Sequence, residues 1–341
     1  MNEKEKTTQL KPLSYCDLGV GYKCNYKCLM CKLWQNSPLC ADNVLSIEQW
    51  KNVLTQIVDL PKKDGCMINF AGSGEALLRG GIFELIKHGR EMGLKIHVIT
   101  NGFAVNKDVA LKMDQSGLES LSFSLDSLNS QTHDYLRGAP GAKDRVLKAI
   151  ELIALHSPNT KMGINTVISG VNIKEVMELT KWVEDHDKLA YINFQAITQP
   201  FSFTDSSKED WFEDEKNKFL WPEDKKAVNQ TIDELIELKQ KHNKIADSAE
   251  QLNIFREYFL NPLLFIKNGR CNLGKGDILI IDPAGHVSMC SIVGIIDNVK
   301  NAKPIRDIMM SPGAQEHKEK INECRLNCHL VVSCYYHEES S

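Results

Sequence analysis

The chain has 341 residues, of which 42% are hydrophobic and 25% are charged, and its formal net charge is −4. These proportions are ordinary for a globular enzyme, and a charge this close to neutral argues against a nucleic-acid partner. Residues 1–13 are polar and lack the apolar segment of a signal peptide, and no apolar run is long enough to span a membrane. We therefore expect a cytoplasmic protein without a membrane partner.

Short apolar runs alternate with amphipathic helical stretches through the first part of the chain. Strands are expected at 16–21, 66–72, 95–100, 120–126, 162–169 and 191–197. Helices are expected between them, at 46–59, 80–92, 105–115, 142–156 and 172–186. Ser46 and Gln49 form a capping box at the start of the first helix, and Asn172 can cap the last. Strand–helix units in series imply a parallel sheet. Because six units cannot complete an eight-unit barrel, the sequence predicts a partial (β/α)6 TIM-type barrel with its chemistry at the C-terminal strand ends.

The pattern changes after the sixth predicted strand. Residues 198–222 are acidic and aromatic without a clean period, which fits either an active-site loop or a plain surface insertion. A helix is expected from 223 to 243, and the segment "DILIIDPAGHVSMC" predicts a β-hairpin around the turn 282–285. The predicted organisation is therefore a core domain over 14–261 and a small Cys-rich α+β module over 262–341.

Eight of the eleven cysteines lie in two clusters, three within residues 24–31 and five within 271–334. In a cytosolic protein, where thiols stay reduced, this clustering favours metal ligation over disulfides. Cys24, Cys28 and Cys31 directly follow the first predicted strand. Three thiolates without an obvious fourth fit a four-iron cluster in which one iron lacks a cysteine. A zinc site completed by a distant ligand, or three free cysteines, are the alternatives.

The Cx3Cx2C motif on the loop after the first strand resembles the radical S-adenosylmethionine (SAM) superfamily. Further motifs of that family follow at the ends of the next three predicted strands: "FAGSGEALL" (70–78), "TNG" (100–102) and "SLDS" (124–127). The resemblance implies that Cys24, Cys28 and Cys31 hold a [4Fe-4S] cluster whose fourth iron binds SAM. One electron would then cleave SAM to methionine and a 5′-deoxyadenosyl radical, which removes a hydrogen atom from an unactivated C–H bond.

The resemblance also implies a set of SAM-binding residues. The backbone of Gly72, Ser73 and Gly74 would approach SAM closely, although Ser73 stands where the family has glycine. Glu75 would accept a hydrogen bond from the SAM ammonium group, and Met30 would pack near the adenine. A solvated strand-end carboxylate is the alternative for Glu75.

Further polar residues are expected around SAM. The resemblance implies that Ser124 and Asp126 bind the ribose hydroxyls and that Arg137 pairs with the methionine carboxylate. Asn101, Asn165 and Gln195 are expected to line the site. The alternatives are a solvated carboxylate for Asp126, a surface cation for Arg137, a turn residue for Asn101 and buried, hydrogen-bonded amides for Asn165 and Gln195.

The C-terminal cysteines resemble the twitch or SPASM modules that carry auxiliary clusters in radical SAM enzymes. Cys271 and Cys290 flank the predicted hairpin, and Cys324, Cys328 and Cys334 follow it. Five thiols cannot fully ligate two clusters, so one auxiliary [4Fe-4S] cluster is expected, held by Cys271, Cys290 and two of the other three. A structural zinc ion is the alternative.

The resemblance implies a peptide modification such as epimerisation, cross-linking or oxidation, with electrons from a flavodoxin- or ferredoxin-type donor. Cys40, on the loop after the cluster motif, is a candidate hydrogen-atom donor, or an incidental loop cysteine. A dehydrogenase or epimerase of a small sugar or amino-sugar is the enzymatic alternative. An iron–sulfur electron carrier or redox sensor is the alternative of another class, but such a protein has no use for SAM-binding polar groups.

Overall fold

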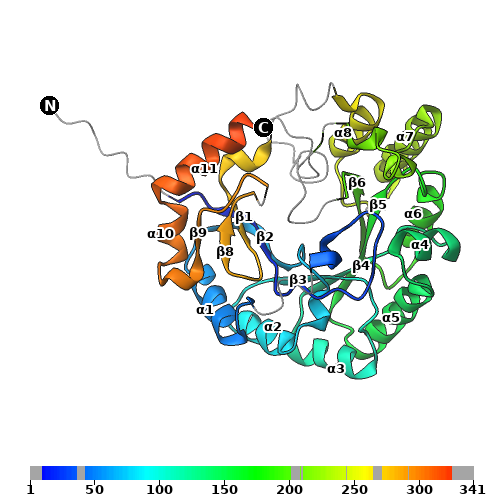
Figure 1. The fold of residues 1–341 in the computed structure, drawn as a ribbon. Coiled ribbons are helices and arrows are strands. Elements are labelled where there is room, and N and C mark those ends of the chain that lie inside the picture. The colour runs from blue at the N-terminus through cyan, green and yellow to red at the C-terminus, as the bar shows by residue number, and fades with distance from the viewer. Residues whose placement is uncertain are drawn as a thin grey trace.

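Nine strands form one open sheet in the computed structural model, which describes residues 10–36, 43–200, 208, 210–242, 244–263, 271–290 and 292–324. The first six strands in the chain are parallel and adjacent in sequence order. They are β1 (Leu13–Leu18), β2 (Lys62–Phe70), β3 (Ile96–Thr100), β4 (Ser120–Ser124), β5 (Lys161–Ile168) and β6 (Tyr191–Ala196). Because β6 ends the sheet without pairing to β1, the barrel is open, and the predicted partial barrel is confirmed (Figure 1).

The helices that connect these strands form an outer ring around the sheet (Figure 1). They include α1 (Ile47–Val58), α2 (Ile82–Glu91), α3 (Lys107–Ser116), α5 (Ala142–His156) and α6 (Val176–Asp185), close to the predicted ranges. The predicted capping box opens α1, since the Ser46 hydroxyl accepts from the Gln49 amide and the Gln49 side chain accepts from the Ser46 amide. One face of α1 is buried, with Trp50, Val53, Leu54 and Ile57, so local capping and core packing agree.

Two described helices of the predicted core domain, 14–261, were not expected from the sequence. α4 (Ser130–Arg137) has only eight, mostly polar residues between an Asn129 cap and a left-handed Gly138, and two of its buried side chains, His133 and Arg137, are polar, so no apolar pattern marks it. α8 (Ala249–Leu260) packs on the predicted helix α7 (Lys225–Lys241). Within 198–222, Trp211 is buried, so at least this part of the segment packs against the core.

The two faces of the sheet differ in exposure. Alternate side chains of each strand point to opposite faces, and paired residues on neighbouring strands point to the same face. The face under the helices is fully buried and includes Cys16, Ile68, Val98, Phe123 and Ile164. The opposite, concave face keeps partly exposed residues, among them Tyr15, Asp17, Ser124, Asn165 and Gln195. The partial barrel therefore has a lumen lined with polar groups.

The C-terminal part of the described chain extends the same sheet. β7 (Ile278–Ile281) pairs in parallel with β1, and the predicted hairpin is confirmed by β7 with β8 (His286–Ser288), followed by β9 (Asp297–Asn298). α10 (Ile305–Met309) and α11 (Pro312–Glu323) come next. The division at residue 262 stays a prediction, because the first strand of the proposed module is also a strand of the barrel sheet. Across the described ranges, no helix has the length and apolar character needed to cross a bilayer.

Candidate active site

Three cysteines line one cavity at the C-terminal ends of the strands. Cys24, Cys28 and Cys31 share this cavity of about 340 Å³ with Gly72 after β2 and Gln195 near the end of β6. A volume of this size is in the range of small-molecule sites. Residues far apart in the chain therefore meet where the sequence places the chemistry.

The three thiols suit a multi-iron cluster better than a single ion. Zinc needs its ligands to converge within bonding distance of one point, whereas each thiolate of a four-iron cluster binds a different iron. In the described part of the chain, no three His, Cys, Asp or Glu side chains are grouped closely enough to hold one metal ion. Burial raises the pKa of Cys24 and of Cys31 to about 11, so these thiols stay protonated until a metal displaces the proton.

Backbone hydrogen bonds fix the cluster loop to the segment after β2 and to α4. The Glu75 amide donates to the Lys23 carbonyl at 2.8 Å, and the Leu29 amide donates to the Leu136 carbonyl at 2.9 Å. A Cβ at Gly74 would lie only 2.7 Å from the carbonyl oxygens of Gly21 and Lys23. Gly74 is therefore required for the close approach of the cluster loop, a reason that the sequence did not show.

Glu75 joins the ends of β2 and β3. Its buried carboxylate accepts from the Thr100 hydroxyl at 2.6 Å, from the Asn101 amide at 2.8 Å and from the Leu77 amide at 3.3 Å. The Asn101 side chain in turn donates to Asn25 Oδ1, in the cluster loop, at 3.0 Å. Burial raises the pKa of Glu75, and these bonds oppose the rise. Glu75 and Asn101 thus lie together beside the cluster loop, and their contact with SAM stays a proposal.

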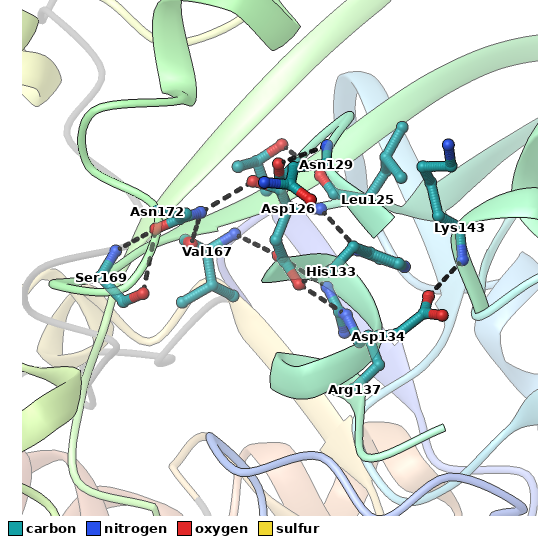
Figure 2. A network of polar contacts seen from close by, with 12 residues as sticks. Leu125, Asp126, Asn129, His133, Asp134, Arg137, Lys143, Val167, Ser169 and Asn172 are labelled. Atoms are coloured by element: carbon teal, nitrogen blue, oxygen red, sulfur yellow. Dashed lines mark hydrogen bonds and ion pairs between the residues drawn. The ribbon is translucent and has the colours of Figure 1, made fainter. Parts of the chain in front are cut away.

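Asp126 and Arg137 form a buried ion pair (Figure 2). Arg137 Nη2 donates to Asp126 Oδ1 at 2.8 Å, and Arg137 Nε lies 2.7 Å from Asp126 Oδ2. The Val167 amide also donates to Oδ1, at 3.1 Å. Asp126 has no exposed surface and Arg137 is 9% exposed, so Arg137 is not a surface cation and Asp126 is not a solvated carboxylate. Asp126 therefore has protein donors on its carboxylate, and its expected contact with the ribose hydroxyls stays a prediction.

Two residues that the sequence did not assign to the site hold the backbone around Asp126 (Figure 2). His133 Nδ1 accepts from the Asp126 amide at 3.1 Å, and burial lowers the pKa of His133 to about 4, which keeps it neutral. Asn172 Nδ2 donates to the carbonyls of Asp126 and Val167, both at 2.9 Å. The prediction that Asn172 caps a helix is wrong, because α6 begins at Val176. The sequence signal that could have placed His133 beside the site is its spacing of four residues, one helical turn, from Arg137.

The remaining predicted residues fall into three groups. Met30, Gly72, Arg137 and Gln195 line the main cavity. Ser124 and Asn165 are paired in register on the concave face. Ser73 is buried, and its hydroxyl fills the space beside Gly19 where a larger side chain would otherwise lie. Cys40, Cys328 and Cys334 lie outside the described residues, so the hydrogen-donor role of Cys40 stays a prediction. The sequence did not identify Tyr26, Trp34 and Val167, which also line the cavity.

Three C-terminal cysteines lie near one another. Burial raises the pKa of Cys271 to about 11, and the nearby thiols of Cys290 and Cys324 add to the rise. Cys271 precedes a short 3-10 helix, η5 (Asn272–Lys275), against which α11 packs so closely that a Cβ at Gly274 would meet Asn322. This packing brings Cys324, the residue after α11, toward Cys271.

Residues 18–183 match the Radical SAM superfamily, a range that contains the three-cysteine loop and strands β2 to β5. This part of the chain is a radical SAM domain. Enzymes of this superfamily use a [4Fe-4S] cluster together with SAM, and several solved structures with the same fold contain SAM, also written AdoMet. The cavity with its three thiols fits that pair of cofactors.

Curated relatives of this radical SAM protein match about half of it. The AdoMet-dependent heme synthase of Methanosarcina barkeri is 30% identical over 168 residues, which cover 49% of this chain and 46% of that enzyme. The antilisterial bacteriocin subtilosin biosynthesis protein AlbA of Bacillus subtilis is 27% identical over 166 residues, which cover 48% of this chain and 35% of AlbA. The chain therefore spans less than half the length of either relative.

Solved structures show the same fold over most of the chain. Streptococcus suis SuiB has a TM-score of 0.66 at 17% identity, covering 89% of this chain and 67% of SuiB. The structure of anSMEcpe with bound AdoMet has a TM-score of 0.63 at 18% identity, covering 90% of this chain and 82% of that one. The shared fold thus continues beyond residue 183 into the C-terminal part of the radical SAM protein.

Proposed function

We propose that this radical SAM enzyme cleaves SAM reductively and abstracts a hydrogen atom from a C–H bond of a ribosomally made peptide. The observation that carries the proposal is the single cavity that the three cysteines share with the ends of β2 and β6. Cys24, Cys28 and Cys31 would hold the cluster. When bound, the cluster and SAM together supply the 5′-deoxyadenosyl radical.

The protein's own residues orient these groups and exclude water. Burial raises the pKa of Cys28, and the Arg137 guanidinium beside it opposes the rise, which favours the thiolate that a metal needs. Leu33 and Trp34 cover part of the cavity, and the Trp34 ring nitrogen donates to the Cys31 carbonyl at 2.9 Å. Apolar side chains in the wall of a cavity reduce the access of water and stray hydrogen donors to a reactive radical.

Two kinds of relatives support a peptide substrate. AlbA acts in the biosynthesis of subtilosin, a bacteriocin, and shares sequence with the radical SAM domain. SuiB and anSMEcpe, which share the fold, have been solved with a precursor peptide and with a peptide, respectively. The concave face of the sheet also offers a polar lumen below the cavity, with Ser124, Asn165 and Gln195 partly exposed. We place the substrate there.

The electron is proposed to come from a flavodoxin- or ferredoxin-type protein. Each cysteine of the cluster loop has a lysine next to it in the sequence: Lys23, Lys27 and Lys32. The segment 18–41 contains no aspartate or glutamate. Lys23 and Lys27 are exposed. A positive surface next to the cluster would attract an acidic electron-transfer protein.

The central experiment uses reconstituted, reduced protein with SAM and follows 5′-deoxyadenosine by mass spectrometry. We expect the product to form, and to carry deuterium when the labelled precursor peptide on which the enzyme acts is added. If no more 5′-deoxyadenosine forms than with iron-free protein, the enzyme proposal is wrong. Deuterium transfer from a labelled sugar instead of a peptide would favour the small-molecule alternative.

Glu75 is proposed to hold the SAM ammonium group. Glu75→Gln removes the charge and keeps only one acceptor oxygen, whereas in wild type the Thr100 hydroxyl donates to Oε1 and the Asn101 amide to Oε2. We expect SAM binding to weaken by about 1.5–3 kcal/mol with unchanged iron content. Isothermal titration with SAM measures the change. The matched control is Asp247→Asn, another buried carboxylate that accepts from a backbone amide, that of Phe194. Equal SAM affinity in the Glu75→Gln variant would remove Glu75 from the site.

An auxiliary [4Fe-4S] cluster is proposed at Cys271, Cys290 and two of the remaining three C-terminal cysteines. Cys271→Ala should lower the iron content toward about four per chain, that of one cluster, while SAM cleavage persists and product formation stops. Iron analysis and product mass spectrometry provide the readouts, with Cys66→Ala as the control cysteine outside both groups. Because metal sites of this size contribute folding energy, solubility is checked first. A soluble variant with full iron and full product yield would argue against the cluster.

A further inference from the structure

The carboxylate of Asp17 lies on the concave face of the sheet, beside the cavity of the candidate active site. On β1 it is in register with Asn69 of β2 and with Ile280 of β7. Gly72, which lines the cavity, has a φ of 87°, and a Cβ built on it would lie 3.1 Å from Asp17 Oδ2. Only a glycine leaves room for this carboxylate next to the cavity wall.

No described neighbour satisfies this carboxylate. Asp17 Oδ1 is buried and has no hydrogen-bond partner within the described part of the chain. The Asn69 amide is used on the Cys16 carbonyl at 3.2 Å, and His97 is bonded to Ser120 at 2.8 Å. Ile280, on the other side, is apolar.

No positively charged side chain among the described residues compensates the charge of Asp17 either. Burial raises its pKa to about 7, and no cation opposes that rise. Burial also lowers the pKa of His97 to about 4, so this nearby ring is neutral. Asp126, by contrast, has Arg137 as its ion-pair partner at the same end of the barrel. Asp17 thus has no counter-charge among the described residues.

A buried carboxylate without donors is costly, and in native proteins such groups point to a ligand or a catalytic role. The residue as a whole is still partly exposed to the lumen, so a ligand can reach it. We propose that Asp17 is a substrate-binding carboxylate, which accepts a hydrogen bond from an N–H group of the substrate peptide in the lumen. This inference rests on the proposed function, because it names the part of the lumen that holds the peptide.

The first test needs no substrate and compares the melting temperatures of wild type and Asp17→Asn. Since the folded pKa is raised above the ordinary value, the ionised carboxylate destabilises the fold increasingly between about pH 4 and pH 7, and fully above pH 7. Asp17→Asn is therefore expected to melt higher than wild type at pH 8 and to gain less at pH 5. Asp126→Asn is the matched control and is expected to melt lower, because it breaks an ion pair. A lower melting temperature in Asp17→Asn at pH 8 would overturn the proposal.

The second test uses the precursor peptide that wild type modifies. Asp17→Asn is expected to raise the KM for the peptide by on the order of tenfold, while the Kd for SAM, measured by titration, stays unchanged. An unchanged KM, or a loss of SAM affinity, would contradict a contact with the substrate. If wild type forms 5′-deoxyadenosine but modifies no peptide, the proposed substrate class fails, and the melting comparison alone decides whether Asp17 is an unpartnered carboxylate.

Discussion

Cys28→Ala is expected to abolish reductive cleavage of SAM, down to the level of iron-free protein. Cys28 lines the same cavity as Cys24 and Cys31, and a cluster held by two thiolates loses the ligand set that keeps its SAM-binding iron in place. The measurement is 5′-deoxyadenosine formed after anaerobic reconstitution and reduction with dithionite, a chemical reductant that needs no protein donor. Iron and sulfide analysis of the same samples shows whether the cluster is lost.

The matched control is Cys66→Ala, a buried cysteine on β2 that lies outside both cysteine groups. It should keep its iron and its SAM cleavage if the protein folds. Full cleavage by the Cys28→Ala variant would show that the three cysteines do not hold the catalytic cluster. Loss of iron in both variants would instead indicate a general folding defect.

Asp126→Asn is expected to lower the free energy of unfolding by about 3–5 kcal/mol. The variant keeps the shape of the side chain but leaves the Arg137 guanidinium, which is only 9% exposed, without its counter-charge. An asparagine can keep the hydrogen bond from the Val167 amide to Oδ1, and His133 accepts from the backbone amide of residue 126, so the expected loss comes from the ion pair. Urea unfolding followed by circular dichroism measures the change.

Two comparisons make this second prediction specific to a buried pair. Glu84→Gln breaks the exposed ion pair between Lys51 and Glu84, and should cost less than about 1 kcal/mol. The double variant Asp126→Asn with Arg137→Met removes both charges and should recover part of the lost stability, because no unpaired charge stays buried. A loss below 1 kcal/mol in Asp126→Asn would mean that the pair is not buried in solution.

The positions of the strands and the cluster loop were predictable because their signals are local. Apolar runs and helical spacing lie within a few residues of one another, and the three cysteines follow β1 directly. A parallel β/α topology then brings all C-terminal strand ends to one side, so Cys28, Gly72 and Gln195 were expected to meet before any coordinates were known. They line one cavity.

The sequence analysis missed α4 and α8 for different reasons. α4 has only eight residues and buries the polar side chains of His133 and Arg137, so an apolar pattern does not mark it. α8 has Leu252, Phe255 and Phe259 at helical spacing, a signal that was present but was not used. Without α4, the side-chain directions of His133 and Arg137 could not be inferred. The expectation that Asp126 binds the ribose came from the family resemblance, and neither that resemblance nor strand alternation identifies Arg137 as its ion-pair partner.

The sequence by itself determined the superfamily motifs, the order of the strands and the loop that carries Cys24, Cys28 and Cys31. Only the tertiary structure decided which carboxylates are satisfied: Asp126 has Arg137, while Asp17 has no described partner. The physical reason is that the free energy of a buried charge depends on donors from other elements, and residue spacing does not contain that information. Only the tertiary structure also decided that β7 pairs with β1, because the paired residues Tyr15 and Ile278 lie at opposite ends of the chain.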